Sequence, residues 1–102
     1  MDTITEVRET GSGGRAEQRR LLLAAGSGDT EAFARFYDLT STRVHELSLL
    51  MTRDADAAAS LTRSAYLEAW RSAPSYDPYR VGPLAWLLAI VHATGRQACA
   101  AA

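Results

Sequence analysis

Apolar side chains recur at helical spacing along most of this chain, and the first cluster lies within residues 15–25. Leu21, Leu22 and Leu23 stand there among good helix formers. Gly26 follows, and glycine is the residue that most readily takes the left-handed conformation that closes a helix. The pattern therefore predicts a short first helix over residues 15–25. No run of alternating apolar and polar residues occurs, so no strand is predicted.

A second, longer amphipathic helix is predicted to follow. Asp29 or Thr30 can cap its start with a side-chain oxygen, and apolar positions spaced by threes, fours and sevens continue to Met51. Thr40 and Thr42 lower the helix propensity midway, so we expect a single bent element. The stripe of apolar and aromatic positions consists of Phe33, Phe36, Tyr37, Val44, Leu47 and Met51.

A third helix is predicted to end near Ser72, because Pro74 cannot continue it. Asp54 and Asp56 supply a cap and negative charge at its start. Its apolar arc is broad, so the helix should contact more than one neighbour. The inner face consists of Ala58, Leu61, Ala65 and Ala69, and the arc is widened by Tyr66, Leu67 and Trp70.

Residues 74–82 contain two prolines, a glycine and two tyrosines, a composition typical of an ordered loop. Pro83 then suits the first position of a helix, where its missing N–H costs nothing. The helix predicted over residues 83–94 is apolar nearly all round and should be buried on most sides. Gly95 is predicted to end it.

Length and composition leave room for one domain. The chain has 102 residues and is 47% hydrophobic, enough for a modest core. Residues 1–14, which mix acidic and small side chains, are predicted to form a flexible N-terminal tail. Residues 15–95 are predicted to form an all-α domain, a compact bundle of three to four helices, and residues 96–102 a C-terminal tail.

Charge and cysteine content exclude several classes of protein. A net charge of −1 argues against gripping duplex DNA by bulk charge, so any contact with nucleic acid should be local. Cys99 is the sole cysteine, which excludes an intrachain disulfide and fits a reducing compartment. The apolar run of residues 84–91 is far shorter than the ~20 residues that cross a bilayer. We expect a soluble cytoplasmic protein without a membrane contact.

Enzyme signatures are missing from the sequence. It contains no glycine-rich phosphate loop, no paired-histidine zinc helix and no nucleophile elbow. His45 and His92 have no metal-ligating partners at a suitable spacing, and each is expected to be an ordinary surface or partly buried residue. We expect a protein that is not an enzyme and that uses no metal or cofactor.

A more specific signal is an ordered series of short segments. Its two longest members are Leu-Thr-Arg-Ser-Ala-Tyr-Leu-Glu-Ala-Trp-Arg at residues 61–71 and Ala-Trp-Leu-Leu-Ala-Ile-Val-His at residues 85–92. Shorter members lie at residues 33–38, 43–45, 52–54 and 76–78. Over residues 21–92 this order and spacing resembles region 2 of the extracytoplasmic-function sigma factors of bacterial RNA polymerase.

The resemblance implies a role in transcription initiation. In that family the helix matching residues 56–72 docks on the clamp coiled coil of the largest polymerase subunit. Two positions depart from the family: Ser60 replaces an acidic residue and Arg63 replaces a glutamine, which changes the charge offered to a partner. The residues that the resemblance assigns to polymerase binding are Leu61, Thr62, Arg63, Tyr66, Leu67 and Trp70.

For several of these residues a plainer interpretation stays open. One alternative is that Leu61, Ala65 and Trp70 pack the core and contact no partner. Another is that Thr62 and Arg63 face solvent without binding anything.

The loop at residues 76–82 and the following helix resemble the elements with which the family melts promoters and captures unstacked bases of the minus-ten non-template strand. Stacking of a base on an aromatic ring contributes ~1–3 kcal/mol. An equally open interpretation is that these tyrosines pin the loop to the core. Trp86 matches a tryptophan that belongs to the core in this family. The candidate DNA-binding residues are Tyr76, Tyr79, Arg80, His92 and Arg96.

After His92 the family normally continues with several arginines, whereas residues 93–99 keep only Arg96. We therefore expect a sigma-like domain that docks on polymerase core and contacts promoter single strand weakly. The alternative is a degenerate regulatory module that binds a sigma factor, an anti-sigma factor or itself without reading DNA.

Overall fold

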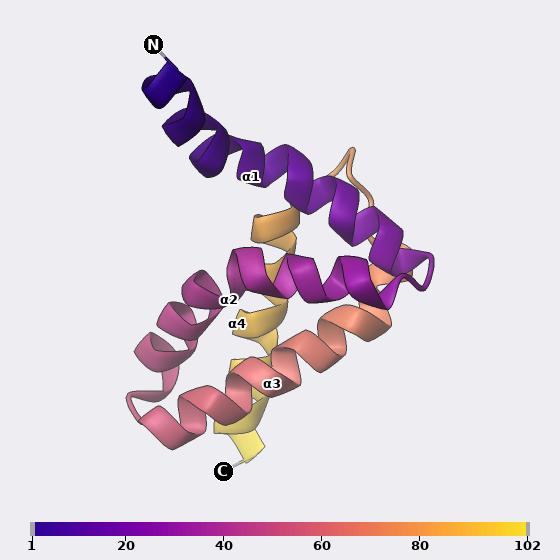
Figure 1. Ribbon diagram of the computed structural model, residues 1–102. Helices are drawn as coiled ribbons and strands as arrows, with labels where there is room; N and C mark the ends of the chain where they lie inside the picture. The colour runs from indigo at the N-terminus through magenta and orange to yellow at the C-terminus, as the bar shows by residue number, and fades with distance from the viewer. Residues whose placement is uncertain (1, 102) are drawn as a thin grey trace.

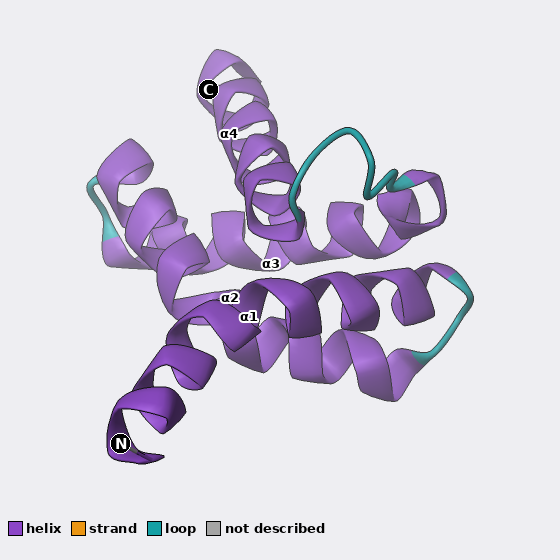
Figure 2. Cartoon of the chain, turned by 90° about the horizontal axis from the view of Figure 1, so that it is seen from above, coloured by secondary structure: helices purple, strands orange, loops and turns teal. Residues whose placement is uncertain are grey.

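The computed structural model describes the backbone of residues 2–101 and the side chains of residues 14–98. The elements are α1 (Asp2–Gly26), α2 (Thr30–Thr52), α3 (Ala55–Ser72), a short 3-10 turn η1 (Ala73–Ser75) and α4 (Pro83–Ala101). Figures 1 and 2 show α1, α2 and α3 stacked beside one another, with α4 crossing them. No strand occurs in this part of the chain, so the predicted all-α bundle is confirmed.

The starts of α2, α3 and α4 lie where local chemistry predicts them. The Asp29 carboxylate accepts a hydrogen bond from the backbone N–H of Ala32 at 3.0 Å and caps α2. Asp54 accepts one from Ala57 N–H at 2.8 Å and caps α3. Such caps satisfy N–H groups that have no partner inside the helix. Pro83 opens α4 as predicted.

The second helix is one element with a bend near its middle (Figure 1). The hydroxyl of buried Thr40 donates a hydrogen bond to the carbonyl of Phe36, 2.7 Å away. A threonine that bonds back to the preceding turn is a recognised cause of helix bending. The predicted single bent helix is confirmed.

The core lies where α4 packs against α2 and α3, with α1 covering α2. Small residues on α3, including Ala58, Ala65 and Ala69, have no exposed surface and let the neighbouring helices approach closely. The largest fully buried apolar side chains come from three helices and are Leu22, Phe36, Val44, Leu87 and Val91.

Two predicted helix ends are wrong. The first helix begins at Asp2 rather than near residue 15, because the glycines at positions 11, 13 and 14 lower helix propensity without forbidding helical backbone angles as a proline would. Gly26 ends that helix without a positive φ, and the left-handed residue is Gly28, at φ 100°. A methyl at Gly26 would lie 2.8 Å from the carbonyl oxygen of Ala73, so this glycine permits a close contact.

The fourth helix does not stop at Gly95 but continues to Ala101. Gly95 is buried, and a Cβ added there would lie 2.5 Å from Cε of Met51 and 3.1 Å from Cδ2 of Leu61. The glycine therefore lets α4 pass close to the end of α2 and the start of α3. The division into tails and a domain stays a prediction, and Met1 and Ala102 lie outside the described residues.

Among the described residues, no helix combines the length and the apolar character that crossing a bilayer requires.

Candidate functional site

The exposed side of α3 carries two of the predicted polymerase-binding residues, Arg63 and Leu67, which lie one helical turn apart. Leu67 is 53% exposed although its side chain is apolar. Arg63 donates only a long hydrogen bond, 3.3 Å, to the neighbouring Ser60 hydroxyl. An apolar side chain and a cation are thus both available to a partner.

The other predicted polymerase-binding residues face inward or lie half-buried. Leu61 and Thr62 are buried, and the Thr62 hydroxyl bonds to the carbonyl of Ala58 at 2.8 Å and to the Ser48 hydroxyl at 3.2 Å. Trp70 is half-buried, with its ring edge-to-face on Phe33 at a centroid distance of 5.2 Å. These side chains hold α3 in the bundle, as the core interpretation of Leu61 and Trp70 expects.

Tyr66 ties the bend of α2 to the middle of α3. Its hydroxyl lies 2.5 Å from the Thr40 hydroxyl, and because Thr40 donates to the carbonyl of Phe36, Tyr66 is the donor of this bond. Burial raises the pKa of Tyr66 to about 12, so its hydroxyl keeps its proton at neutral pH. The residue is 6% exposed and acts as a structural link.

Tyr37 packs on Tyr66 and lies at the surface. Its ring centroid lies 4.5 Å from that of Tyr66, and the residue is 43% exposed. The sequence pattern counts Tyr37 in the apolar stripe of α2. Its position directly after fully buried Phe36, at the edge of the stripe, is the signal that distinguishes it.

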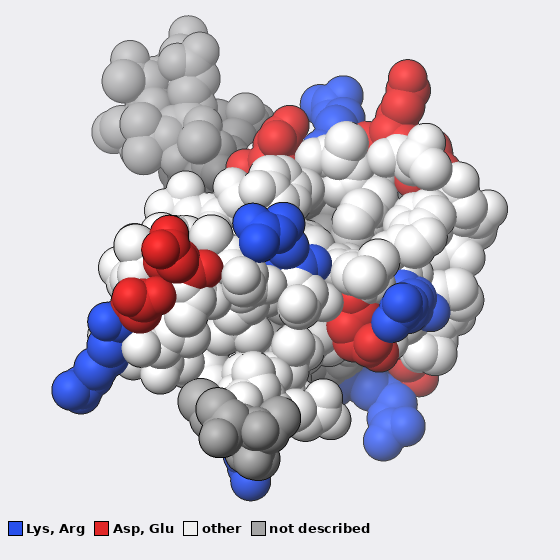
Figure 3. All heavy atoms as spheres, turned by 90° about the horizontal axis from the view of Figure 1, so that it is seen from below, with Lys and Arg blue, Asp and Glu red and all other residues white. Residues whose placement is uncertain are grey.

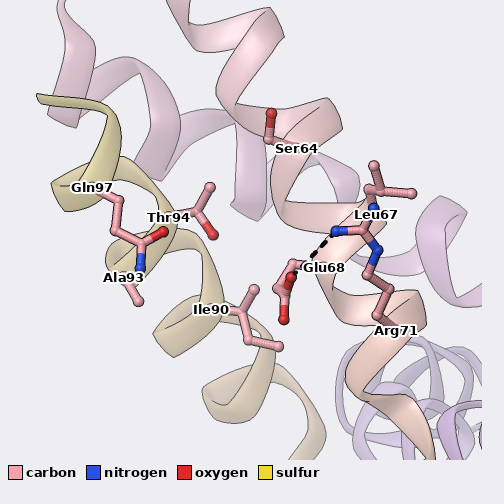
Figure 4. A pocket seen from close by; sticks show the side chains of 8 residues that line it. All are labelled: Ser64, Leu67, Glu68, Arg71, Ile90, Ala93, Thr94 and Gln97. Atoms are coloured by element: carbon pink, nitrogen blue, oxygen red, sulfur yellow. Dashed lines mark ion pairs between the residues drawn. The ribbon is translucent and has the colours of Figure 1, made fainter. Parts of the chain in front are cut away.

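A groove of about 460 Å³ runs between α3 and α4 (Figure 4). Leu67 lies on its α3 wall, and Glu68 and Arg71 form an exposed ion pair of 3.9 Å on the same wall. Sequence patterns missed this groove because it forms only where two helices meet. The lining residues are Ser64, Leu67, Glu68 and Arg71 from α3, and Ile90, Ala93, Thr94 and Gln97 from α4.

A second groove of about 480 Å³ adjoins the first and shares Ser64 and Thr94 with it. Its lining includes Met51 of α2, Leu61 of α3 and Gly95 of α4, so it is mainly apolar. The two grooves together follow much of the α3–α4 contact. The exposed side of α3 is therefore bordered by an extended concave surface.

The loop between η1 and α4 separates the two tyrosines predicted to stack on bases. Tyr76 is 5% exposed, donates its hydroxyl proton to the carbonyl of Val81 at 2.8 Å and packs edge-to-face on Trp86. Tyr79, in contrast, is 97% exposed, and Arg80 is exposed beside it. Tyr76 therefore pins the loop to the core, whereas Tyr79 is available for stacking.

His92 and Arg96 are both exposed on α4, one turn apart. His92 lies nine residues beyond Pro83, which corresponds to about 14 Å along the helix axis. The helix continues through Gly95, so Arg96 lies on α4 and not beyond its predicted end.

Positive charge is not gathered on the face shown in Figure 3, where cationic and acidic side chains are interspersed. Three arginines form exposed ion pairs within their own helices: Arg20 with Glu17, Arg43 with Glu46 and Arg71 with Glu68. Within the described part of the chain, no cluster of three histidine, cysteine or acidic side chains could hold a metal ion.

The chain is similar to a group of sigma factors. It is 44% identical over 84 residues to the ECF RNA polymerase sigma factor SigK of Mycobacterium ulcerans, which covers 81% of this chain and 45% of that protein. It is 42% identical over 77 residues to the SigK of Mycolicibacterium vanbaalenii, covering 76% of this chain and 39% of that protein. The SigK of Mycobacterium tuberculosis strain ATCC 25177 is 40% identical over 72 residues. No family model matches the chain. The chain spans less than half the length of these relatives.

Proposed function

The chain is a homologue of region 2 of the bacterial extracytoplasmic-function sigma factors, and from this kinship we propose that it acts in transcription initiation by docking on RNA polymerase core. The observation that carries the proposal is the exposed face of α3. There Leu67 offers apolar area and Arg63 a cation, beside the groove that α3 forms with α4. The partner element in this proposal is the clamp coiled coil of the largest subunit.

Within this function, the predicted contact residues have two roles. Arg63 and Leu67 make the contact, while Leu61, Thr62 and Tyr66 hold α3 at the right position from inside. An exposed leucine beside a groove is a typical anchor for a partner, because its burial on binding removes apolar surface from water.

Pull-down with core polymerase tests the docking surface. Arg63→Glu and Leu67→Ala are expected to weaken capture at least several-fold without changing the urea midpoint of unfolding. Arg15→Glu and Leu23→Ala are matched controls, because both residues are exposed on α1. Failure of the wild-type protein to bind core polymerase at micromolar concentration would exclude the proposal.

A second part of the proposed function is contact with the minus-ten non-template strand through Tyr79 and Arg80. A ring that is 97% exposed on an ordered loop contributes nothing to the core and is free to stack on a base. Fluorescence titration with a short single-stranded oligonucleotide measures this contact. Tyr79→Ala is expected to weaken binding by a factor of about 5 to 150, since stacking contributes ~1–3 kcal/mol per base.

A regulatory module that binds a sigma factor, an anti-sigma factor or another copy of the chain is the second candidate. The sequence after His92 favours it, because only Arg96 remains there to meet phosphate. The same titration separates the two functions. Saturable, salt-sensitive binding of the oligonucleotide would count against the regulatory module, and a complex with a sigma or anti-sigma factor in gel filtration would favour it.

A further inference from the structure

The loop between η1 and α4 has a conformation held by its own hydrogen bonds. Asp77 is central to it: its carboxylate accepts from the backbone N–H of Tyr79 at 2.9 Å, and its carbonyl accepts from Arg80 N–H at 3.1 Å. The N–H of Val81 reaches the same carbonyl at 3.4 Å. Side-chain oxygens of aspartate commonly fix turns in this way. The backbone that carries Tyr79 and Arg80 is therefore ordered.

Tyr76 closes this loop from the inside. Its hydroxyl donates to the carbonyl of Val81 at 2.8 Å, which links the two ends of the turn that Asp77 organises. Its ring packs on Trp86 of α4 at a centroid distance of 5.4 Å and an angle of 65°. With 5% exposure, Tyr76 cannot stack on a base without leaving this place.

Tyr79 differs from Tyr76 in its exposure and in the use of its side chain. It lies at the tip of the turn, is 97% exposed and supplies only its backbone N–H to the loop. The order of the loop therefore comes from Tyr76 and Asp77, and its exposed chemistry comes from Tyr79 and Arg80. A binding loop that is already ordered loses less conformational entropy when its ligand arrives.

We propose that Tyr76 is a positioning residue, which sets the loop conformation that presents Tyr79 and Arg80 to a nucleic-acid strand. This role rests on the strand contact of the proposed function and deepens it. It reassigns Tyr76 from a residue that touches the strand to one that acts through its neighbour.

Amide hydrogen exchange in the free protein tests the role without any ligand. Tyr76→Phe removes only the hydroxyl and keeps the ring against Trp86. Exchange at the amides of Arg80 and Val81 is expected to become about two- to tenfold faster, the range that corresponds to one lost hydrogen bond. Tyr79→Phe is the matched control, and its exchange pattern should equal that of the wild type because its hydroxyl lies in water.

Binding measurements then connect the loop to the strand. The Kd of Tyr76→Phe for a fluorescein-labelled single-stranded oligonucleotide of mixed sequence should rise by a similar factor. The slope of log Kd against log salt should stay the same, because no phosphate contact is removed. Capture by core polymerase should also stay the same, a combination that general destabilisation would not produce.

The possible results are distinguishable. Unchanged exchange at Arg80 and Val81 in Tyr76→Phe would overturn the positioning role, whatever the oligonucleotide does. Faster exchange with an unchanged Kd would also overturn it, because the loop order would then not matter for binding. Faster exchange in a protein whose wild type binds no oligonucleotide would support the control of the loop by Tyr76 and reject the strand contact of the proposed function.

Discussion

Single residues of the same type have opposite surroundings in this protein, and its four tyrosines show this best. Tyr66 and Tyr76 are buried with bonded hydroxyls, whereas Tyr37 and Tyr79 are exposed. A buried hydroxyl without a partner is costly, so each buried tyrosine is tied to one specific acceptor. For Tyr66 this acceptor is Thr40, at the bend of α2.

Removing the Tyr66 hydroxyl should destabilise the fold. Tyr66→Phe deletes the donor to Thr40 while the ring keeps its contact with Tyr37, so we expect the free energy of unfolding to fall by about 1 kcal/mol. Urea unfolding followed by circular dichroism measures the loss. Tyr79→Phe is the control, and an equal change in both variants would contradict the structural role of the Tyr66 hydroxyl.

Tyr66 also makes stability depend on alkaline pH. Burial raises its pKa to about 12, whereas an unfolded tyrosine titrates near ~10. Between these values the folded protein holds one more proton than the unfolded chain, so its stability is full below pH ~10 and falls toward pH ~12. The stability difference between wild type and Tyr66→Phe should therefore shrink over this range in urea titrations. A constant difference would contradict the prediction.

Two kinds of cause set where a helix begins and where it ends: local capping and the packing of neighbouring helices. The starts of α2 and α3 depend on caps, which are local, and Asp29 and Asp54 cap these helices as their positions indicate. Ends depend more on neighbours, since Gly95 lies inside α4 where the side chains of Met51 and Leu61 approach its backbone closely. A glycine can thus mark either a helix end or a close helix contact.

Filling the space at Gly95 should disrupt the contact between α4 and its neighbours. Gly95→Val places its side chain against Met51 and Leu61, and overpacking of this kind costs about 1–3 kcal/mol. Ala93→Val is the matched control because Ala93 is exposed on the same helix. Thermal and urea unfolding compare the two. Equal stability of the variants would show that the flexible Met51 side chain moves aside.

The cap of α3 offers a test that separates hydrogen bonding from charge. Asp54→Ala removes the acceptor for Ala57 N–H and should cost about 1 kcal/mol of folding free energy. Asp54→Asn keeps an oxygen at the same place and should recover most of that stability. If both variants lost the same stability in urea unfolding, the charge of Asp54 would be the stabilising feature.

At the scale of the whole molecule, opposite charges are mixed, and the net charge is −1. Ion pairs within helices, such as Arg71 with Glu68, neutralise part of the positive charge. This mixing of charges favours a protein that binds its partners through small surface patches. Any contact with a nucleic-acid strand should therefore involve few phosphates.

The salt dependence of oligonucleotide binding should therefore be shallow. If Arg80 and Arg96 each neutralise one phosphate, the slope of log Kobs against log salt should be about −1.4, since single strands contribute about −0.7 per phosphate. Arg80→Ala should reduce its magnitude by about 0.7. A slope several times steeper would show that arginines elsewhere on the surface also contact the strand.

The sequence by itself determined the starts of α2, α3 and α4, the caps of α2 and α3, the bend of α2 and the ordered loop before Pro83. These features arise from interactions between residues close in the chain, such as Asp54 with Ala57 or Thr40 with Phe36. The motif order also indicated the kinship with sigma factors, which the similarity to SigK proteins confirms.

Only the tertiary structure decided which side chains remain at the surface. Helical spacing defines an apolar stripe, but the exposure of residues at its edge depends on where the neighbouring helices lie. Leu67 is thus left open beside the α3–α4 groove, while Tyr66, one position earlier, is buried. Tyr76 is buried because its ring packs on Trp86, and the carbonyl of Val81 satisfies its hydroxyl, whereas Tyr79 stays exposed to water.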